Sequence, residues 1–143
     1  MMSFLAIFWF LVMPPSDIWL SDFLEAQTKA NENHQMILIN FSGSDWCGPC
    51  IQMHKEVFEK DDFKAFAQEN LVLIKADFPR QEKNKLSIQQ LKKNNELALK
   101  YNPDGDFPLT LLLDENLKVL KVWSGNPGLN SNEFVKEMVE ISK

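Results

Sequence analysis

The sequence predicts an α/β protein with a central mixed sheet, helices on both faces of that sheet, and a C-terminal antiparallel hairpin plus helix. One observation is that short, almost wholly apolar runs at residues 36–41 and 71–74 alternate with segments of helical spacing. Buried parallel strands joined by helices require this pattern. A second observation is a pair of apolar runs, residues 109–113 and 118–123, which flank a tight polar turn and predict the hairpin.

The remaining elements are helices, in which apolar residues recur at three- and four-residue spacing. Residues 17–33 are predicted as one amphipathic helix, capped by Ser21 or Asp22. Residues 80–95 are strongly polar and are predicted as a solvated loop leading into a helix that residues 96–101 complete. Further helices are predicted at residues 48–57, from residue 61 onward, and at residues 131–141.

The composition limits the classes of protein and partner. A chain of 143 residues is long enough for a single core, and its 45% of hydrophobic residues argue against disorder. A formal net charge of −5 argues against nucleic acid as a partner, because phosphate binding needs clustered Lys and Arg. With two cysteines, the chain cannot be a scaffold held by several disulfides, so packing must supply its stability.

Residues 1–15 form an apolar leader, treated apart from the domain predicted for residues 16–143. Its unbroken apolar stretch, residues 3–13, would form a helix of about 16 Å, half of a ~30 Å hydrocarbon core. This length predicts a signal peptide rather than a stable membrane span, and hence an extracytoplasmic protein, periplasmic or secreted. The leader lacks Lys and Arg and a clear cleavage site, which leaves open a buried helix or a misassigned start, with a cytoplasmic protein.

Cys47 and Cys50 are the only cysteines, and they stand where a strand pattern gives way to a helix pattern. Two thiols at this spacing can close into a disulfide and reopen, which favours redox chemistry. The plainer alternative is an inert disulfide or two buried thiols. A metal site with His54 and His34 is a further alternative, but Cys₂His₂ spacing is absent, so no metal is expected. His54 is predicted to be an exposed helix residue and His34 a loop residue.

The chain resembles the thioredoxin superfamily, and more narrowly the bacterial thioredoxin-like proteins related to the C-terminal domain of thiol:disulfide interchange proteins. The resemblance runs from about Trp19 to Lys143 and implies a thioredoxin-like three-layer α/β/α sandwich. A bare pair of cysteines three positions apart is a weak signal, whereas the combination of motifs is specific. The matching residues are Phe41, Trp46-Cys47-Gly48-Pro49-Cys50, Met53, Val57-Phe58, Lys75-Ala76-Asp77, Phe107-Pro108, Leu111-Leu112-Leu113-Asp114 and Gly125.

The resemblance implies a thiol–disulfide oxidoreductase in which Cys47 is the nucleophile and Cys50 the resolving thiol. Cys47 precedes a predicted helix, whose N-terminus lowers the pKa of a thiol from about 8.5 toward about 7. Gly48-Pro49 is the dipeptide of thioredoxins, whose potential near about −270 mV favours reduction of protein disulfides. The implied partners are proteins with disulfides and an upstream thiol donor, with no cofactor. The working direction stays open, because compartment and donor can override an intrinsic potential.

The family also implies where a substrate chain docks. A cis Pro108 would lie beside the cysteine pair, with the backbone of Phe107 next to the substrate. Trp46, Gly48 and Pro49 complete the implied substrate-binding set. In thioredoxins, a buried acid at the position of Asn40 assists proton transfer from the second cysteine. Asparagine cannot take up a proton at neutral pH, so this assistance is absent here or moved elsewhere.

Leu109 replaces the threonine that usually follows the cis-proline, and we expect a more apolar docking surface. Asp45 is expected to oppose a Cys47 thiolate. Asp77 is predicted to cap the segment after its strand, with proton transfer as the alternative role. Trp19 and Trp123 are predicted to be core residues.

Two other functions remain open at this point. One is a non-catalytic binding or chaperone-like module, with a static disulfide and an apolar surface around Trp46, Phe107 and Leu109. The other is redox-linked metal delivery, which the ligand spacing supports less well.

Overall fold

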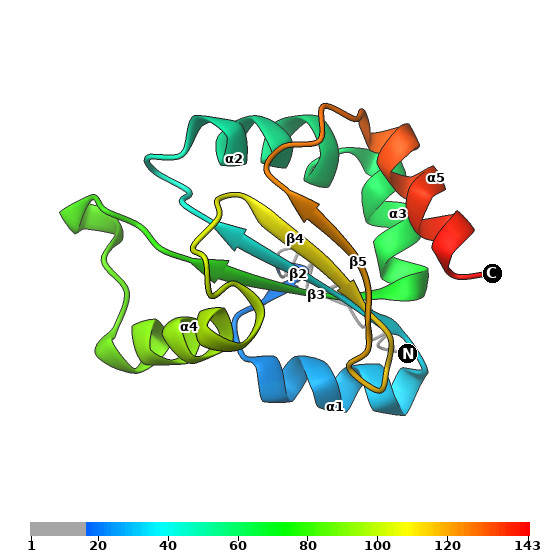
Figure 1. Ribbon diagram of the computed structural model, residues 1–143, viewed down its shortest axis with the longest axis horizontal. Coiled ribbons are helices and arrows are strands. Elements are labelled where there is room, and N and C mark those ends of the chain that lie inside the picture. The colour runs from blue at the N-terminus through cyan, green and yellow to red at the C-terminus, as the bar shows by residue number, and fades with distance from the viewer. Residues whose placement is uncertain (1–16) are drawn as a thin grey trace, which may run out of the picture.

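The structure of the protein, a computed structural model, describes residues 17–143 as a five-stranded sheet with helices on both faces (Figure 1). The strand order is β1-β3-β2-β4-β5. β3 pairs in parallel with β1 and β2, whereas β4 is antiparallel to β2 and β5. The predicted mixed sheet and terminal hairpin are therefore confirmed. The strands are β1 (Trp19–Leu20), β2 (Met36–Ser42), β3 (Leu71–Asp77), β4 (Leu109–Leu113) and β5 (Val119–Ser124).

The helices form two layers: α1 and α4 cover one face of the sheet, and α2, α3 and α5 cover the other (Figure 1). Their bounds are α1 (Phe23–Asn33), α2 (Gly48–Met53), α3 (Asp61–Asn70), α4 (Ile88–Tyr101) and α5 (Ser131–Ile141). Two shorter helical segments follow α2 and precede α4. They are a π-helix, η1 (His54–Phe58), and a 3₁₀ turn, η2 (Glu82–Asn84).

The central strand β2 separates two hydrophobic cores, because successive side chains of a strand point to opposite faces. Ile37 and Ile39 pack toward α1 and α4 with Ala30 and Leu97. Leu38 packs toward the other layer, against Met53 and the helices that follow it. β2 is thus buried on both faces, as its apolar sequence predicted.

Aromatic side chains dominate the core beneath α2, α3 and α5. Phe134 packs against Phe58, Phe63 and Trp123, with ring centroids 6.0, 6.3 and 4.6 Å away. Trp123 is buried and donates a hydrogen bond of 2.8 Å from Nε1 to Glu137 Oε2. Trp19 is half-buried at the edge of this cluster, so the prediction of a core position holds fully for Trp123 alone.

The prediction of one helix over residues 17–33 is wrong at its start. Trp19 and Leu20 form the edge strand β1, paired with Leu73 and Ile74 of β3. The helix begins only after Asp22, whose Oδ1 accepts hydrogen bonds from the backbone N–H groups of residues 24 and 25 at 2.9 and 3.1 Å. The conformation of these residues depends on pairing with a strand that is distant in sequence. The hydrophobic periodicity within the segment therefore does not predict it.

The start of α4 is also earlier than predicted. Residues 88–95 were expected in a loop, yet α4 begins at Ile88, where Ser87 Oγ accepts a hydrogen bond of 3.1 Å from Gln90 N. This helix is hard to recognise from the sequence, because most of its residues are polar and only a narrow stripe of it is buried. Asn94 belongs to that stripe and donates from Nδ2 to the carbonyl of Asp77 at 2.8 Å. Leu99, outside this stripe, is 77% exposed.

The predicted apolar leader, residues 1–15, lies outside the described residues. Within residues 17–143, no helix is both long enough and apolar enough to cross a bilayer.

Truncating Phe134 should destabilise the fold far more than truncating an exposed residue of the same helix. We expect Phe134→Ala to lower the free energy of unfolding by about 3–5 kcal/mol, the usual cost of emptying a buried aromatic site. Val139→Ala, on the exposed side of α5, is the matched control and should cost less than about 1 kcal/mol. Urea unfolding of the oxidised protein measures both, and equal losses would contradict the packing described.

Candidate active site

The cysteine pair lies at the carboxyl end of β2, at the junction with α2. β2 ends at Ser42, and the carbonyl of Gly43 accepts hydrogen bonds from the N–H groups of Trp46 and Cys47 at 3.2 and 2.9 Å. This tight turn ends the strand and makes Cys47 the N-cap of α2. Pro49 falls in the first helical turn, where the missing N–H has no intrahelical partner to lose.

Cys47 and Cys50 form a disulfide, with Cα atoms 5.2 Å apart. The backbone N–H of Cys50 donates to Cys47 Sγ at 3.3 Å, so the helix N-terminus is directed at that sulfur. Cys47 is 4% and Cys50 3% exposed, so burial does not distinguish the two. Position does, because Cys47 caps the helix and Cys50 lies within its first turn. Gly48 and Pro49, between them, are exposed.

The segment before β4 reaches the same end of the sheet. Leu109 pairs with Phe41 near the end of β2, which places residues 107–108 beside the cysteine loop. The Phe107–Pro108 peptide bond is cis, and the carbonyl of Pro108 accepts a hydrogen bond from Gly125 N at 2.8 Å. Leu109 is only 5% exposed and packs in the core, so the expected apolar docking surface at this residue is wrong.

The ring of Trp46 connects the cysteine loop to its neighbours. Its Nε1 donates to the carbonyl of Phe78 at 2.7 Å, and its ring meets that of Phe107 edge-on at 5.5 Å. A Cβ at position 43 would lie 2.3 Å from Cε2 of the tryptophan, so Gly43 leaves space that the ring occupies. On another side, the guanidinium carbon of Arg80 lies 3.6 Å from the ring centroid.

Three of these contacts were not anticipated from the sequence, namely those made by Gly43, Phe78 and Arg80. A glycine between a strand and the cysteine motif is a local signal for close approach of a side chain. The aromatic and basic residues that follow β3 give no such signal, since their contact with Trp46 depends on strand pairing.

Asp77 holds the cysteine loop from the end of β3. Its Oδ1 accepts hydrogen bonds from the N–H groups of Ser44 and Phe78 at 2.9 and 3.0 Å, and its Oδ2 accepts from the Ser44 hydroxyl. This carboxylate caps the backbone that follows its strand, as predicted. It also joins that backbone to the loop before the cysteines.

Asp45 ties the same loop to residues 80–84. Its carboxylate accepts from Arg80 N at 2.9 Å, Gln81 N at 3.0 Å and Asn84 Nδ2 at 3.0 Å. The hydrogen bond from Arg80 N, followed by that from Asn84, holds the pKa of Asp45 below its ordinary value. Both of its oxygens therefore bind this neighbouring segment, and the expected opposition of its charge to a Cys47 thiolate stays a prediction.

Asn40 occupies the position beneath the motif where a buried acid was expected from the family. It is 5% exposed, and its Nδ2 donates to Thr110 Oγ1 at 3.0 Å. The amide therefore links β2 to β4 by a neutral hydrogen bond. A neutral pair satisfies both buried side chains without burying a charge.

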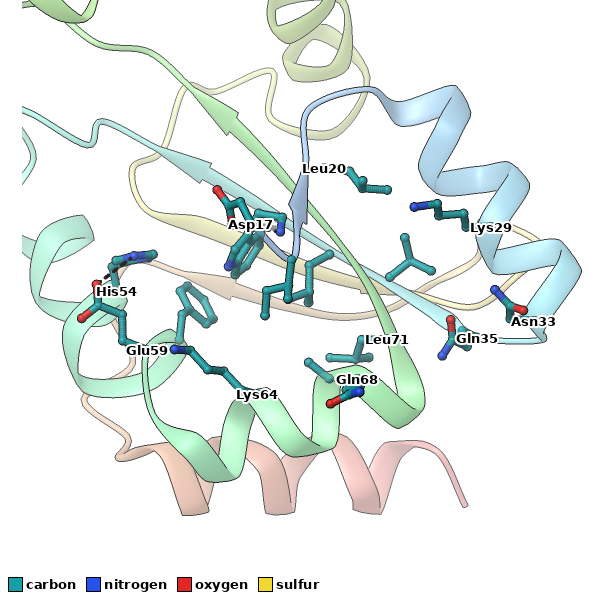
Figure 2. A pocket seen from close by; sticks show the side chains of 16 residues that line it. Asp17, Leu20, Lys29, Asn33, Gln35, His54, Glu59, Lys64, Gln68 and Leu71 are labelled. Carbon is teal, nitrogen blue, oxygen red and sulfur yellow. Dashed lines mark hydrogen bonds and ion pairs between the residues drawn. The ribbon is translucent and has the colours of Figure 1, made fainter. Parts of the chain in front are cut away.

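A separate cavity of about 700 Å³ opens at the β1 edge of the sheet (Figure 2). His54 lies at one end of it, with Nε2 3.3 Å from Glu59 Oε1, and Lys64 of α3 and Lys29 of α1 also line it. None of residues 46–50 or 107–108 contributes to its wall. His54 is half-buried rather than exposed as predicted, because its ring packs against Phe58, with centroids 6.4 Å apart, where both residues line this cavity (Figure 2).

The two histidines considered as metal ligands make separate contacts. His34 follows α1 and its Nδ1 lies 2.9 Å from Glu115 Oε2, whereas His54 pairs with Glu59. Across residues 17–143, no group of three or more His, Cys, Asp or Glu side chains is placed to hold a metal ion.

A mixed sheet of this order, with a cysteine pair capping a helix beside a cis-proline, defines a thioredoxin-fold protein. The family model described as thioredoxin-like matches residues 18–114. The chain therefore belongs to the thioredoxin-like family.

Relatives within this family are Dsb-type proteins of Chlamydia pneumoniae. The disulfide bond reductase DsbH is 35% identical over 106 residues, which cover 74% of this chain and 62% of DsbH. The thioredoxin-related protein DsbJ is 32% identical over 129 residues, which cover 87% of this chain and 36% of DsbJ. The chain thus spans less than two thirds of either relative.

A solved structure titled DsbH oxidoreductase has the same fold. It superimposes with a TM-score of 0.76 at 28% identity, and the match covers 91% of each chain. Fold, family and paired cysteines together support a thiol–disulfide oxidoreductase.

The half-buried His54 should make stability depend on pH. Burial, and next the positive charge of Lys75, lower the pKa of His54 from its ordinary 6.5, against opposing effects of Glu59 and Asp17. The unfolded chain therefore binds this proton more readily than the folded protein, so stability falls as pH drops from about 6.5 through the lower folded value. The melting temperature of His54→Gln should decline less steeply than wild type between pH 7 and pH 5.

The matched control is Gln68→Asn, which changes a residue that lines the same cavity and carries no titratable group. It should keep the wild-type slope. Identical slopes for His54→Gln and wild type would show that burial of this imidazole does not affect stability.

Proposed function

We propose that this chain is an enzyme, a thiol–disulfide oxidoreductase that reduces protein disulfides through Cys47 and Cys50. The observation that carries the proposal is the disulfide at the N-terminus of α2, next to the cis Phe107–Pro108 bond. Membership of the thioredoxin-like family and a relative named disulfide bond reductase support the same activity.

The reaction begins from the dithiol form. The N-terminus of α2, including the N–H of Cys50, favours a thiolate at Cys47. This thiolate attacks one sulfur of a substrate disulfide, forming a mixed disulfide and releasing the other substrate sulfur as a thiolate. Cys50, after losing its proton, attacks Cys47 Sγ and releases the second substrate thiolate.

Two electrons thereby pass to the substrate, whose two sulfurs take up protons as thiols, and Cys47 and Cys50 end as a disulfide. An upstream dithiol donor must then return two electrons to the pair. Because the cysteines carry the electrons, the step uses neither an organic cofactor nor a metal. The Gly48-Pro49 dipeptide, shared with reducing thioredoxins, supports the reducing direction.

The substrate chain would dock beside the cysteines on the surface formed by Trp46, Gly48, Pro49 and the backbone around Phe107 and Pro108. The exposure of Gly48 and Pro49 supports an approach over the N-terminus of α2. The edge-on contact between Trp46 and Phe107 supports a shared aromatic wall on one side of that approach.

We further propose that the protein acts outside the cytoplasm, periplasmic or secreted, on disulfide-containing proteins. The apolar stretch of residues 3–13 supports export through a signal peptide. The relationship to Dsb-type proteins supports protein disulfides as the substrates.

The activity is tested by insulin reduction with dithiothreitol as the electron source. Cys47→Ser should lower turnover at least about 100-fold, to the rate of dithiothreitol alone, because the remaining Cys50 lies within the first turn of α2 and not at the N-cap that favours a thiolate. The matched variant Cys50→Ser should also lose turnover but accumulate a mixed disulfide at Cys47, seen by mass spectrometry. Equal turnover by wild type and Cys47→Ser would contradict the proposed enzymatic function. The alternative, a binding module with a static disulfide, would then be favoured.

Export is tested by the mass of the protein recovered from its native host. We expect a mature N-terminus between residues 13 and 20, since signal peptides are removed after the apolar region. Recovery of soluble protein that retains Met1 would contradict export and place the activity in the cytoplasm.

A further inference from the structure

Arg80 places a positive charge on the aromatic wall beside the cysteine pair. Its guanidinium carbon lies 3.6 Å from the centroid of the Trp46 ring, over the face of the indole. Trp46 directly precedes Cys47, and Arg80 is exposed. A planar guanidinium stacked in this way keeps its edge N–H groups free to donate hydrogen bonds.

The backbone of Arg80 is fixed by hydrogen bonds to Asp45. Asp45 Oδ1 accepts from Arg80 N at 2.9 Å, and Asp45 Oδ2 accepts from Gln81 N and Asn84 Nδ2 at 3.0 Å each. Gln81 Nε2 donates in return to the carbonyl of Asp45 at 3.1 Å. The two residues before Cys47 therefore hold Arg80 at both ends, at a defined place near the reacting sulfur.

The charge of Arg80 has no carboxylate partner within residues 17–143, since none of the ion pairs in this part of the chain includes it. Asp45, its neighbour, uses its oxygens on N–H groups of residues 80–84. Glu82 pairs instead with Lys85, at 3.5 Å. A guanidinium without a carboxylate partner can bind a carboxylate of another molecule, because its planar N–H groups can donate two parallel hydrogen bonds.

We infer that Arg80 selects protein substrates that carry an acidic residue next to the reactive cysteine. The inference rests on the proposed reductase function and names the class of substrate. The whole chain carries a net charge of −5, so long-range attraction does not bring acidic partners to it. Recognition acts at contact, where Arg80 pairs with the substrate carboxylate while the substrate sulfur reaches Cys47.

The test uses three cyclic peptides, each with one disulfide, identical except for Glu, Gln or Lys beside one cysteine. Reduced protein is mixed with each peptide, and the second-order rate of peptide reduction is followed by chromatography. Rates with dithiothreitol alone, which also attacks as a thiolate, correct for the intrinsic reactivity of each disulfide. The proteins compared are wild type, Arg80→Gln, Arg80→Glu and the control Lys83→Gln, which removes a cation from the same segment without touching Trp46.

Wild type should reduce the Glu peptide about three- to fivefold faster than the Gln peptide, the size of an exposed ion pair, and the Lys peptide most slowly. Arg80→Gln should remove this preference, Arg80→Glu should reverse it, and Lys83→Gln should keep it. The preference should shrink in 1 M salt, where the Debye length falls to about 3 Å.

Two results would overturn the inference: equal corrected rates for the three peptides with wild type, or a preference that survives in Arg80→Gln. Neither result affects the proposed reductase function, which predicts reduction of all three peptides. Failure of wild type to reduce any of them would instead reject that function, and the inference with it.

Discussion

The pairing of β2 with both β3 and β4 is the constraint on which the rest of the structure depends. β2 runs parallel to β3, so Ser42 and Asp77 end their strands side by side. It runs antiparallel to β4, so Leu109 begins its strand opposite Phe41. The cysteine loop, the segment after β3 and the Phe107–Pro108 bond therefore meet at one end of the sheet. Each has a side chain or a carbonyl group at the site, although they are far apart in sequence.

Trp46 is the shared partner of these three segments. It contacts Phe107, the carbonyl of Phe78 and the guanidinium of Arg80, and it occupies the space that Gly43 leaves open. The ring thus orients the surface that a substrate would meet before Cys47. In the proposed function, chemistry and selection are separable, because the two sulfurs would exchange electrons while the neighbouring side chains would contact the substrate.

The parts of the fold that could be predicted are those whose signal lies within one segment. β2 and β4 are apolar on both faces, and α5 has a clear apolar stripe, so local pattern was enough. β1 was missed because two residues at an edge carry no periodicity, and their strand conformation comes from pairing with β3. The start of α4 was missed because its buried stripe includes Asn94, which only its bond to the Asp77 carbonyl explains.

The sequence by itself determined where the cysteine pair lies: two cysteines three positions apart, a proline between them and a helix starting there predict a redox pair. Only the tertiary structure decided what surrounds that pair. Leu109 packs in the core, Asp45 accepts hydrogen bonds from residues 80–84, and Arg80 lies on the ring of Trp46. The physical reason is range, since capping and helix geometry act within a few residues, whereas strand pairing brings together groups more than thirty positions apart.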